Sequence, residues 1–291
     1  MPTRIVAATD FSSLAGFGVE RAAALAREHQ CPLHVLHVYN DFAWEHLRTL
    51  LRAPPWHAGE AAARERLQTQ ARDLAVRYGL PAVDGAVITG RASTGIATCA
   101  REIGAGLIAL GAHGAGIVQE LALGGTAIKV LRASPCPVLV VRREPRIAYE
   151  TIVVATDFSA TAVRAFRAAV DLFPDATYIA VNAYSVAMEG RMRMAGATAD
   201  DIERYREQER EMAQRDIATY AVQAGFDDAS AARTLVRHGY PAPVLIEESQ
   251  RLGAHLLVVG KHGASVLDER LLGSVTLNVL HHAPCDVLLV P

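Results

Sequence analysis

Small residues with a regular spacing near the end of the chain predict an anion-binding loop. Gly260 and Gly263 are followed, after nine residues, by Gly273 and Ser274, in the pattern Gly-x-x-Gly-x9-Gly-Ser. Glycines allow the backbone to approach a phosphate closely, and the first amides of a helix carry partial positive charge. We therefore expect a phosphate cradle at the start of a helix, to which Ser274 and Thr276 add hydroxyl donors.

A second copy of this pattern lies in the first half of the chain. It reads Gly111-Ala112-His113-Gly114, followed by Gly124-Gly125-Thr126. Gly125 stands where the later copy has Ser274, which keeps a backbone N–H but removes a hydroxyl contact worth about 1.5–3 kcal/mol. We expect the later copy to be the better phosphate site and leave binding by the first copy open.

Each of these motifs also has a purely structural interpretation. A glycine pair after a strand often forms only a turn, and Asp10 and Asp157 are placed where each could cap the next helix. His113 and His262 recur at one loop position, which suits phosphate contact or loop packing; they belong to separate halves, so no metal site is expected. The recurrence of the pattern in both halves favours a ligand role.

The elements that must position these residues are also repeated. Arg4–Ser12 reads RIVAATDFS and Thr151–Ser159 reads TIVVATDFS in a chain of 291 residues. The repeat predicts two domains, residues 1–146 and 147–291. A hydrophobic content of 51% and a charged content of 21% are typical of globular domains with their own cores.

Apolar strands alternate with helices in both halves. This order predicts an α/β fold of two doubly wound five-stranded parallel sheets, each with helices on both faces. Ligands bind such sheets beyond the carboxyl ends of the strands, where the winding reverses. The predicted strands are 5–9, 33–39, 86–89, 107–111 and 137–141, then 152–156, 178–183, 233–236, 255–260 and 286–290; the predicted helices include 12–27, 60–77, 93–103, 122–132 and 275–282.

Charge and hydropathy exclude several classes of protein. The formal net charge of −2 lacks the basic surplus that holds a phosphodiester backbone, so nucleic acid is not an expected partner. The apolar runs are too short to insert in a membrane, and the N-terminus has no signal-peptide pattern, so we expect a cytoplasmic protein. Cys136 and Cys285 occupy equivalent places and are expected to be small buried residues rather than a disulfide.

Two segments differ between the halves. Residues 40–57 carry Trp44 and Trp56, and residues 185–199 carry several methionines among arginines. Either segment could pack on the sheet or on a partner subunit, and either could instead form an adaptable lid or an apolar ligand site.

Taken together, these motifs resemble the universal stress protein (UspA) family in its tandem two-domain form. The resemblance rests on the Asp-Phe-Ser that follows each first strand, on the glycine loop, and on the closing Pro-Cys-x-Val-Leu strand, and it covers essentially the whole chain. It implies a Rossmann-like fold of the adenine nucleotide alpha hydrolase type, with the two fifth strands paired as an intrachain pseudo-dimer. We also expect a further homodimer, because two fused domains still have other faces to bury.

In nucleotide-binding members of that family, the loop holds the phosphates of ATP, the aspartate lies beside adenine and ribose, and the end of the second strand lines the adenine pocket. The resemblance therefore implies ATP, with Mg²⁺, as the ligand. In the second half the implied site is Ala155, Asp157, Ala183, Val259, Gly260, Lys261, His262, Gly263, Gly273, Ser274, Val275 and Thr276. In the first half it is Ala8, Asp10, Val38, Gly111, His113, Gly114, Gly124, Gly125 and Thr126.

The residues themselves predict a phosphate site, and the resemblance implies a stress-response regulatory role with an unknown protein partner. The loop matches neither the P-loop nor the dinucleotide Gly-x-Gly-x-x-Gly pattern, and no nucleophile elbow or paired-carboxylate motif is present. We therefore expect no catalytic residues and at most a slow ATPase. A binding module for an apolar small molecule or a protein partner is the alternative.

Overall fold

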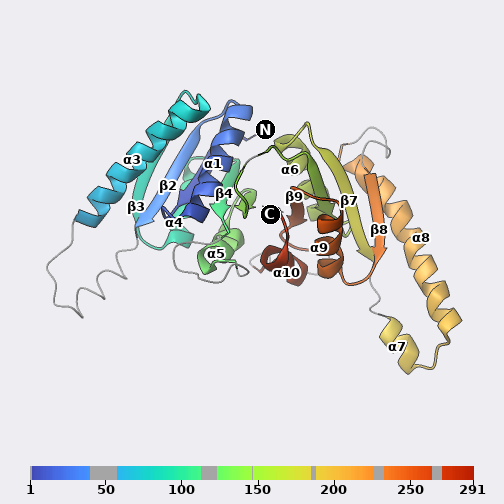
Figure 1. Ribbon diagram of the computed structural model, residues 1–291. Coiled ribbons are helices and arrows are strands. Elements are labelled where there is room, and N and C mark those ends of the chain that lie inside the picture. The colour runs from blue at the N-terminus through green and yellow to red at the C-terminus, as the bar shows by residue number, and fades with distance from the viewer. Residues whose placement is uncertain are drawn as a thin grey trace, which may run out of the picture. The chain divides into compact units, whose positions relative to one another are not determined.

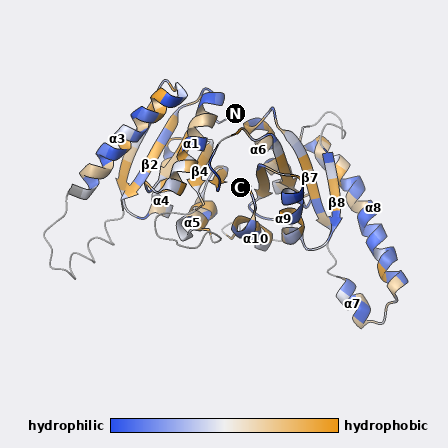
Figure 2. Cartoon of the chain, in the orientation of Figure 1, coloured by the Kyte–Doolittle hydropathy of each residue, from blue (hydrophilic) through white to orange (hydrophobic). Residues whose placement is uncertain are grey.

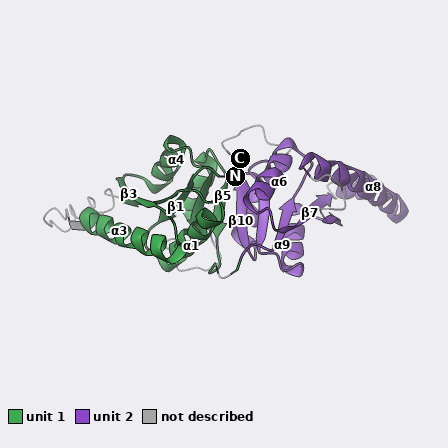
Figure 3. Ribbon diagram, turned by 90° about the horizontal axis from the view of Figure 1, so that it is seen from above, with its two compact units in different colours: residues 1–147 green, residues 148–291 purple. Residues whose placement is uncertain are grey.

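The computed structural model describes residues 2–39, 58–112, 123–145, 147–184, 188–225, 233–263 and 271–291. The chain forms two compact units, Met1–Ile147 and Ala148–Pro291 (Figure 3). In the described residues, no helix is both long and apolar enough to cross a membrane.

The first unit is a parallel sheet with helices on both faces and the strand order β3-β2-β1-β4-β5 (Figure 1). Its strands are β1 (Ile5–Thr9), β2 (Leu33–Tyr39), β3 (Val83–Thr89), β4 (Leu107–Gly111) and β5 (Val138–Val141). Its helices are α1 (Ser13–Glu28), α3 (Ala58–Tyr78), α4 (Ala92–Glu102) and α5 (Gly125–Ala133).

The second unit repeats this order as β10-β9-β6-β7-β8. Its strands are β6 (Thr151–Ala155), β7 (Thr177–Tyr184), β8 (Arg233–His238), β9 (Leu256–Gly260) and β10 (Asp286–Val290). Its helices are α6 (Ala160–Leu172), α7 (Glu189–Met194), α8 (Ala199–Gln223), α9 (Pro241–Arg251) and α10 (Ser274–His282).

The central strands carry the core of each unit. All residues of β1 and β10 are buried, and Figure 2 shows that β2 and β4 are largely apolar whereas α8 is largely hydrophilic. Strands covered on both faces must be apolar throughout, which is why their sequence does not alternate. The prediction of two doubly wound α/β sheets is therefore confirmed. In each unit the winding reverses beside the first strand, between β1 and β4 and between β6 and β9.

Two predicted boundaries are wrong by a few residues. The helix predicted over 122–132 begins at Gly125, because Gly124 is its extended N-cap with ψ 141°. The strand predicted over 86–89 begins at Val83, because Asp84 and Gly85 pair in register with His34 and Val35 despite their low strand propensity. In the strand, pairing with a segment distant in sequence overrides the local signal; in the helix, the residue next to its first turn sets where it begins.

The cysteines at the equivalent positions are buried, as expected. Cys136 is 8% exposed and Cys285 is 1% exposed, and neither forms a disulfide. Burial raises the pKa of the Cys136 thiol to about 11. This thiol is therefore a packing group that stays protonated at neutral pH.

One of the two unusual segments contains the short helix α7, whereas residues 40–57 and 185–187 lie outside the described part of the chain. Glu189 of α7 is buried against α8, where Nε and Nη2 of Arg206 donate to its two oxygens, each at 2.7 Å. Nε2 of His238 lies 2.8 Å from the same carboxylate. Met188 and Met194 are 45% and 90% exposed, so these two methionines do not cover the sheet.

The Glu189 ion pair predicts that the free energy of unfolding depends on pH. Hydrogen bonds from Arg206, supported by His238, lower the pKa of Glu189 from 4.5 to about 2. A carboxyl group whose pKa is lower in the folded state stabilises the fold at every pH above its unfolded-state pKa. This contribution is lost as the pH falls from about 4.5 to 2. We expect Glu189→Gln to lower the free energy of unfolding by about 1–2 kcal/mol at pH 7 and by progressively less below pH 4.5 in urea titrations.

Glu203→Gln is the matched control, because its side chain is 72% exposed and lies 3.3 Å from Nη1 of the same arginine. It should change the free energy of unfolding little at any pH. A Glu189→Gln effect that is independent of pH would contradict the assignment of the stabilisation to the ionised carboxylate.

Candidate functional site

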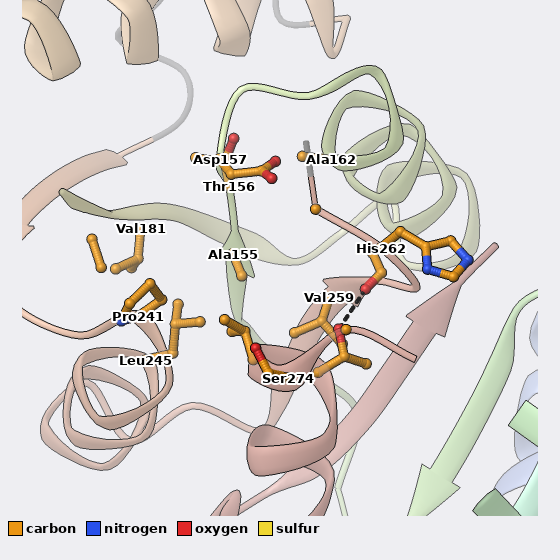
Figure 4. Close-up of a pocket in the computed structure, with 16 residues that line it drawn as sticks. Ala155, Thr156, Asp157, Ala162, Val181, Pro241, Leu245, Val259, His262 and Ser274 are labelled. Atoms are coloured by element: carbon orange, nitrogen blue, oxygen red, sulfur yellow. Dashed lines mark hydrogen bonds between the residues drawn. The ribbon is translucent and has the colours of Figure 1, made fainter. Parts of the chain in front are cut away.

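A cavity of about 280 Å³ opens at the carboxyl ends of β6 and β9, where the winding of the second unit reverses (Figure 4). Every residue predicted for the second half lines it except Lys261. The structure adds lining residues that sequence reasoning missed: Thr156, Ala162, Val181, Pro241 and Leu245.

The main chain of Lys261 supports the loop instead. Its amide donates to the carbonyl of Val290 at 2.7 Å, and its carbonyl accepts from the amide of Gly273 at 3.2 Å. The side chain is 7% exposed. Lys261 therefore ties the two ends of the glycine loop to the sheet.

The start of α10 forms the polar side of the cavity. Gly273 is its N-cap, and a glycine offers no side chain to cap the helix. Helix geometry gives the amides of Ser274, Val275 and Thr276 no partner within the helix. By contrast, Ser159 caps α6, accepting from the amide of Ala162 at 3.2 Å. The start of α10 thus presents open amides to an anion at this cavity, whereas the start of α6 is capped by its own serine.

The two hydroxyls expected at this helix have different roles. Ser274 is exposed at the cavity. Thr276 is 4% exposed and donates to the carbonyl of Gly260 at 2.9 Å. The expectation of a ligand donor is therefore corrected for Thr276: its proton is used to fix the end of β9, because its position in the first turn points it back at the strand.

Asp157 lies opposite, in a turn with an unusual backbone. Phe158 has φ 63°, a left-handed value that costs about 1–3 kcal/mol for a bulky residue. Thr156 Oγ1 accepts from the amide of Phe158 at 2.9 Å, and Asp157 Oδ1 accepts from the amide of Ser159 at 3.1 Å. Since Ser159 caps the helix, Asp157 is not the helix cap.

The second carboxylate oxygen of Asp157 faces the glycine loop. A Cβ placed on Gly263 would lie 2.8 Å from Asp157 Oδ2, so only a glycine fits there without displacing the carboxylate. In Figure 4 the imidazole of His262 points away from Asp157 and Ser274. This orientation favours loop packing over phosphate contact for the histidine ring.

Apolar side chains form the remaining wall. Ala155, Val181 and Ala183 come from neighbouring strands, and Pro241 and Leu245 come from the first turns of α9 (Figure 4). Val181 shares a strand face with Ala183, so the alternation of a strand could have identified it. Nothing in the local pattern marks Pro241 or Leu245, because α9 reaches the site only through the fold.

The first unit has the same frame. Phe11 has φ 64°, Asp10 Oδ1 accepts from the amide of Ser12 at 3.0 Å, and Gly124 is an N-cap without a side-chain bond. In the described ranges of the chain, no atom lies within 4 Å of a Cβ added to Gly125. Ala8, Val38, Gly111 and Thr126 lie at the ends of β1, β2 and β4 and at the start of α5, whereas His113 and Gly114 lie outside the described residues.

Comparison with known proteins gives one consistent result. A sequence model of the Universal stress protein family matches residues 1–142 and again 148–291. A universal stress protein of Thermus aquaticus is 32% identical over 138 residues, which are 47% of this chain and 97% of that protein. Universal stress protein YxiE of Bacillus subtilis is 29% identical over 149 residues, covering 49% of this chain and all of the relative.

Solved structures share the fold over the whole length. The crystal structure of a universal stress protein from Archaeoglobus fulgidus aligns with 99% of this chain and 98% of its own, with a TM-score of 0.67 and 17% identity. A second, from Pseudomonas aeruginosa, aligns with 99% of this chain and 92% of its own, with a TM-score of 0.63 and 20% identity. At such identities the likeness concerns the fold alone.

Proposed function

The chain belongs to the universal stress protein family, with one family domain in each half, and from this premise we propose that its second unit binds an adenine nucleotide. The proposed ligand is ATP with Mg²⁺, and the proposed role is regulatory, in a cytoplasmic stress response. Binding by the first unit is proposed to be weaker.

A single observation carries the proposal: one cavity is lined by an uncapped helix start, by an apolar wall, and by a carboxylate that faces the glycine loop. The amides at Ser274, Val275 and Thr276 suit phosphate oxygens. The wall around Ala183 and Leu245 suits a planar heterocycle. The carboxylate of Asp157 can accept hydrogen bonds from ribose hydroxyls.

Mg²⁺ would be carried mainly by the phosphates. Among the residues that the structure describes, no group of three or more His, Cys, Asp or Glu side chains is placed to hold a metal ion. Mg²⁺ commonly binds through substrate phosphates and few carboxylates, so Asp157 is the side chain of this cavity that could contribute. The ion would neutralise phosphate charge at the open side of the cradle.

The weaker binding proposed for the first unit follows from its own residues. Gly125 replaces the exposed hydroxyl of Ser274, and Ala127 replaces the buried hydroxyl of Thr276 that holds the end of β9. The open helix start is kept at Gly124. The first unit therefore lacks one hydroxyl that could contact the phosphates and one hydrogen bond that could fix the loop.

Calorimetric titration of the full chain with ATP, adenosine and tripolyphosphate tests the proposal. We expect ATP to bind more tightly than either fragment, because phosphate and base contact different walls. Gly273→Val should weaken the binding of ATP and of tripolyphosphate by at least about tenfold. A Cβ at this position would lie 4.0 Å from Gly263 N, so the valine methyl groups would enter the space between that amide and the helix start.

Unchanged ATP affinity in Gly273→Val would place the ligand elsewhere. Native mass spectrometry of gently purified protein gives an independent outcome. A co-purified adenine nucleotide supports the proposal, and a lipid-like mass that ATP does not displace would replace it with an apolar-ligand binding module.

A further inference from the structure

The turn that carries Asp157 is braced from outside the cavity. Its backbone is strained at Phe158, and local bonds from Thr156 Oγ1 and Asp157 Oδ1 satisfy the amides that follow. The carbonyl of Thr156 receives a further bond from the neighbouring strand: Asn182 Nδ2 of β7 donates to it at 2.8 Å.

Asn182 does not line the cavity. Its neighbours Val181 and Ala183 do, and since side chains alternate along a strand, Asn182 points to the other face of the sheet. It is 6% exposed, and its Oδ1 has no hydrogen-bond partner among the described residues. Burying an amide whose oxygen has no hydrogen-bond partner costs free energy. The hydrogen bond from Nδ2 to the Thr156 carbonyl is therefore the feature that explains why an asparagine is buried here.

The first unit makes the same bond with a different residue. His37 of β2 occupies the place of Asn182, and its Nδ1 lies 2.8 Å from the carbonyl of Thr9. A carbonyl can only accept, so Nδ1 carries the hydrogen. The rest of the turn is also equivalent, with Thr9 Oγ1 accepting from the amide of Phe11 at 3.0 Å. Two side chains of different chemistry thus bond to the equivalent carbonyl in the two units.

We propose that Asn182 is a positioning residue for nucleotide binding: by holding the carbonyl of Thr156, it sets the peptide plane that aims the Asp157 carboxylate at the site. His37 does the same for Asp10 in the first unit. The inference rests on the proposed function, because it concerns the same cavity, and it adds a residue that never touches the ligand.

The reason is geometric. The Thr156 carbonyl and the Asp157 amide share one rigid peptide plane, so releasing the carbonyl lets the plane rotate and swings Asp157 with it. Asp157 Oδ2 has little room on the loop side, where it abuts Gly263. A small rotation would therefore change both the carboxylate and the loop that holds the phosphates.

Three variants of the full chain test this. Asn182→Leu removes the donor at similar size, Asn182→Asp replaces the donor with an acceptor, and Asn182→His installs the residue that the first unit uses. We expect ATP affinity at the second unit to fall about tenfold in the Leu and Asp variants and to return to within about threefold of the parent in the His variant.

Tyr178→Phe is the matched control in the same strand. The Tyr178 hydroxyl donates to the carbonyl of Ala169 at 2.9 Å, at the far end of β7 from the cavity. This variant should lower the free energy of unfolding and leave ATP affinity unchanged, whereas Asn182→Leu should lower affinity without a matching loss of stability.

A second measurement does not depend on the nucleotide. Amide hydrogen exchange at Phe158 and Ser159 should become faster in Asn182→Leu and stay slow in Asn182→His, since these amides bond to Thr156 and Asp157. Unchanged exchange and ATP affinity in Asn182→Leu would overturn the inference, as would a His variant no better than the Leu variant. If the parent protein binds no adenine nucleotide but the exchange pattern holds, the proposed function fails and the positioning of Asp157 stands.

Discussion

Gly263→Ala is expected to weaken ATP binding to the second unit by about a hundredfold while changing the stability of the fold little. The added Cβ would lie 2.8 Å from Asp157 Oδ2, so the carboxylate must turn away or the loop must retreat. Either movement removes charge-assisted contacts worth about 1.5–3 kcal/mol each. Because the exposed carboxylate can turn into solvent, the change should weaken ATP binding and leave the free energy of unfolding nearly unchanged. Calorimetry measures the affinity, and urea unfolding measures the stability.

Gly190→Ala in the same unit is the control for adding a methyl group. No atom of the described part of the chain lies within 4 Å of a Cβ at this position on α7, and an alanine there favours the helix by about 0.5–1 kcal/mol. ATP affinity should be that of the parent. If Gly263→Ala also binds ATP like the parent, the contact between Asp157 and the glycine loop has no part in binding.

Ala183→Val is expected to weaken ATP and adenosine equally, by about tenfold or more, and to leave tripolyphosphate unaffected. Ala183 belongs to the apolar wall of a cavity of about 280 Å³, close to the lower limit for small-molecule sites of about 300 Å³. Two further methyl groups would occupy space needed by the base, and overpacking typically costs about 1–3 kcal/mol. Equal losses for ATP and adenosine would assign Ala183 to the base.

The reciprocal change in the first unit is the control. Val38 takes the place of Ala183 and is accommodated by Gly95 of α4, whose added Cβ would lie 3.3 Å from a Val38 methyl carbon. Val38→Ala should leave binding at the second unit unchanged. An Ala183→Val variant that weakens tripolyphosphate as much as ATP would show that the valine disturbs the loop rather than the base wall.

Much of the fold follows from local pattern. The alternation of largely apolar strands with helices predicted both sheets, because a central strand buried on two faces has no other composition available. The repeat of Asp-Phe-Ser and of the glycine loop predicted which strand ends carry the site. Those motifs act through the backbone of a few consecutive residues, so their spacing alone carries the information.

The cavity itself needed more than local pattern. Pro241 and Leu245 reach it because α9 crosses the sheet, and Thr276 proved to brace Gly260 because of where its rotamer points. Asn182 is a single polar residue among apolar neighbours in its strand, a pattern that gives no sign of its bond to Thr156.

The amino-acid sequence by itself determined two repeated α/β domains and a glycine loop at the start of a late helix in each, since strand composition and glycine spacing are local properties. Only the tertiary structure decided which side chains wall the cavity, which hydroxyl is left for a ligand, and which strand holds Asp157 in place. Those properties depend on the direction of side chains from residues distant along the chain, and no spacing rule encodes that direction.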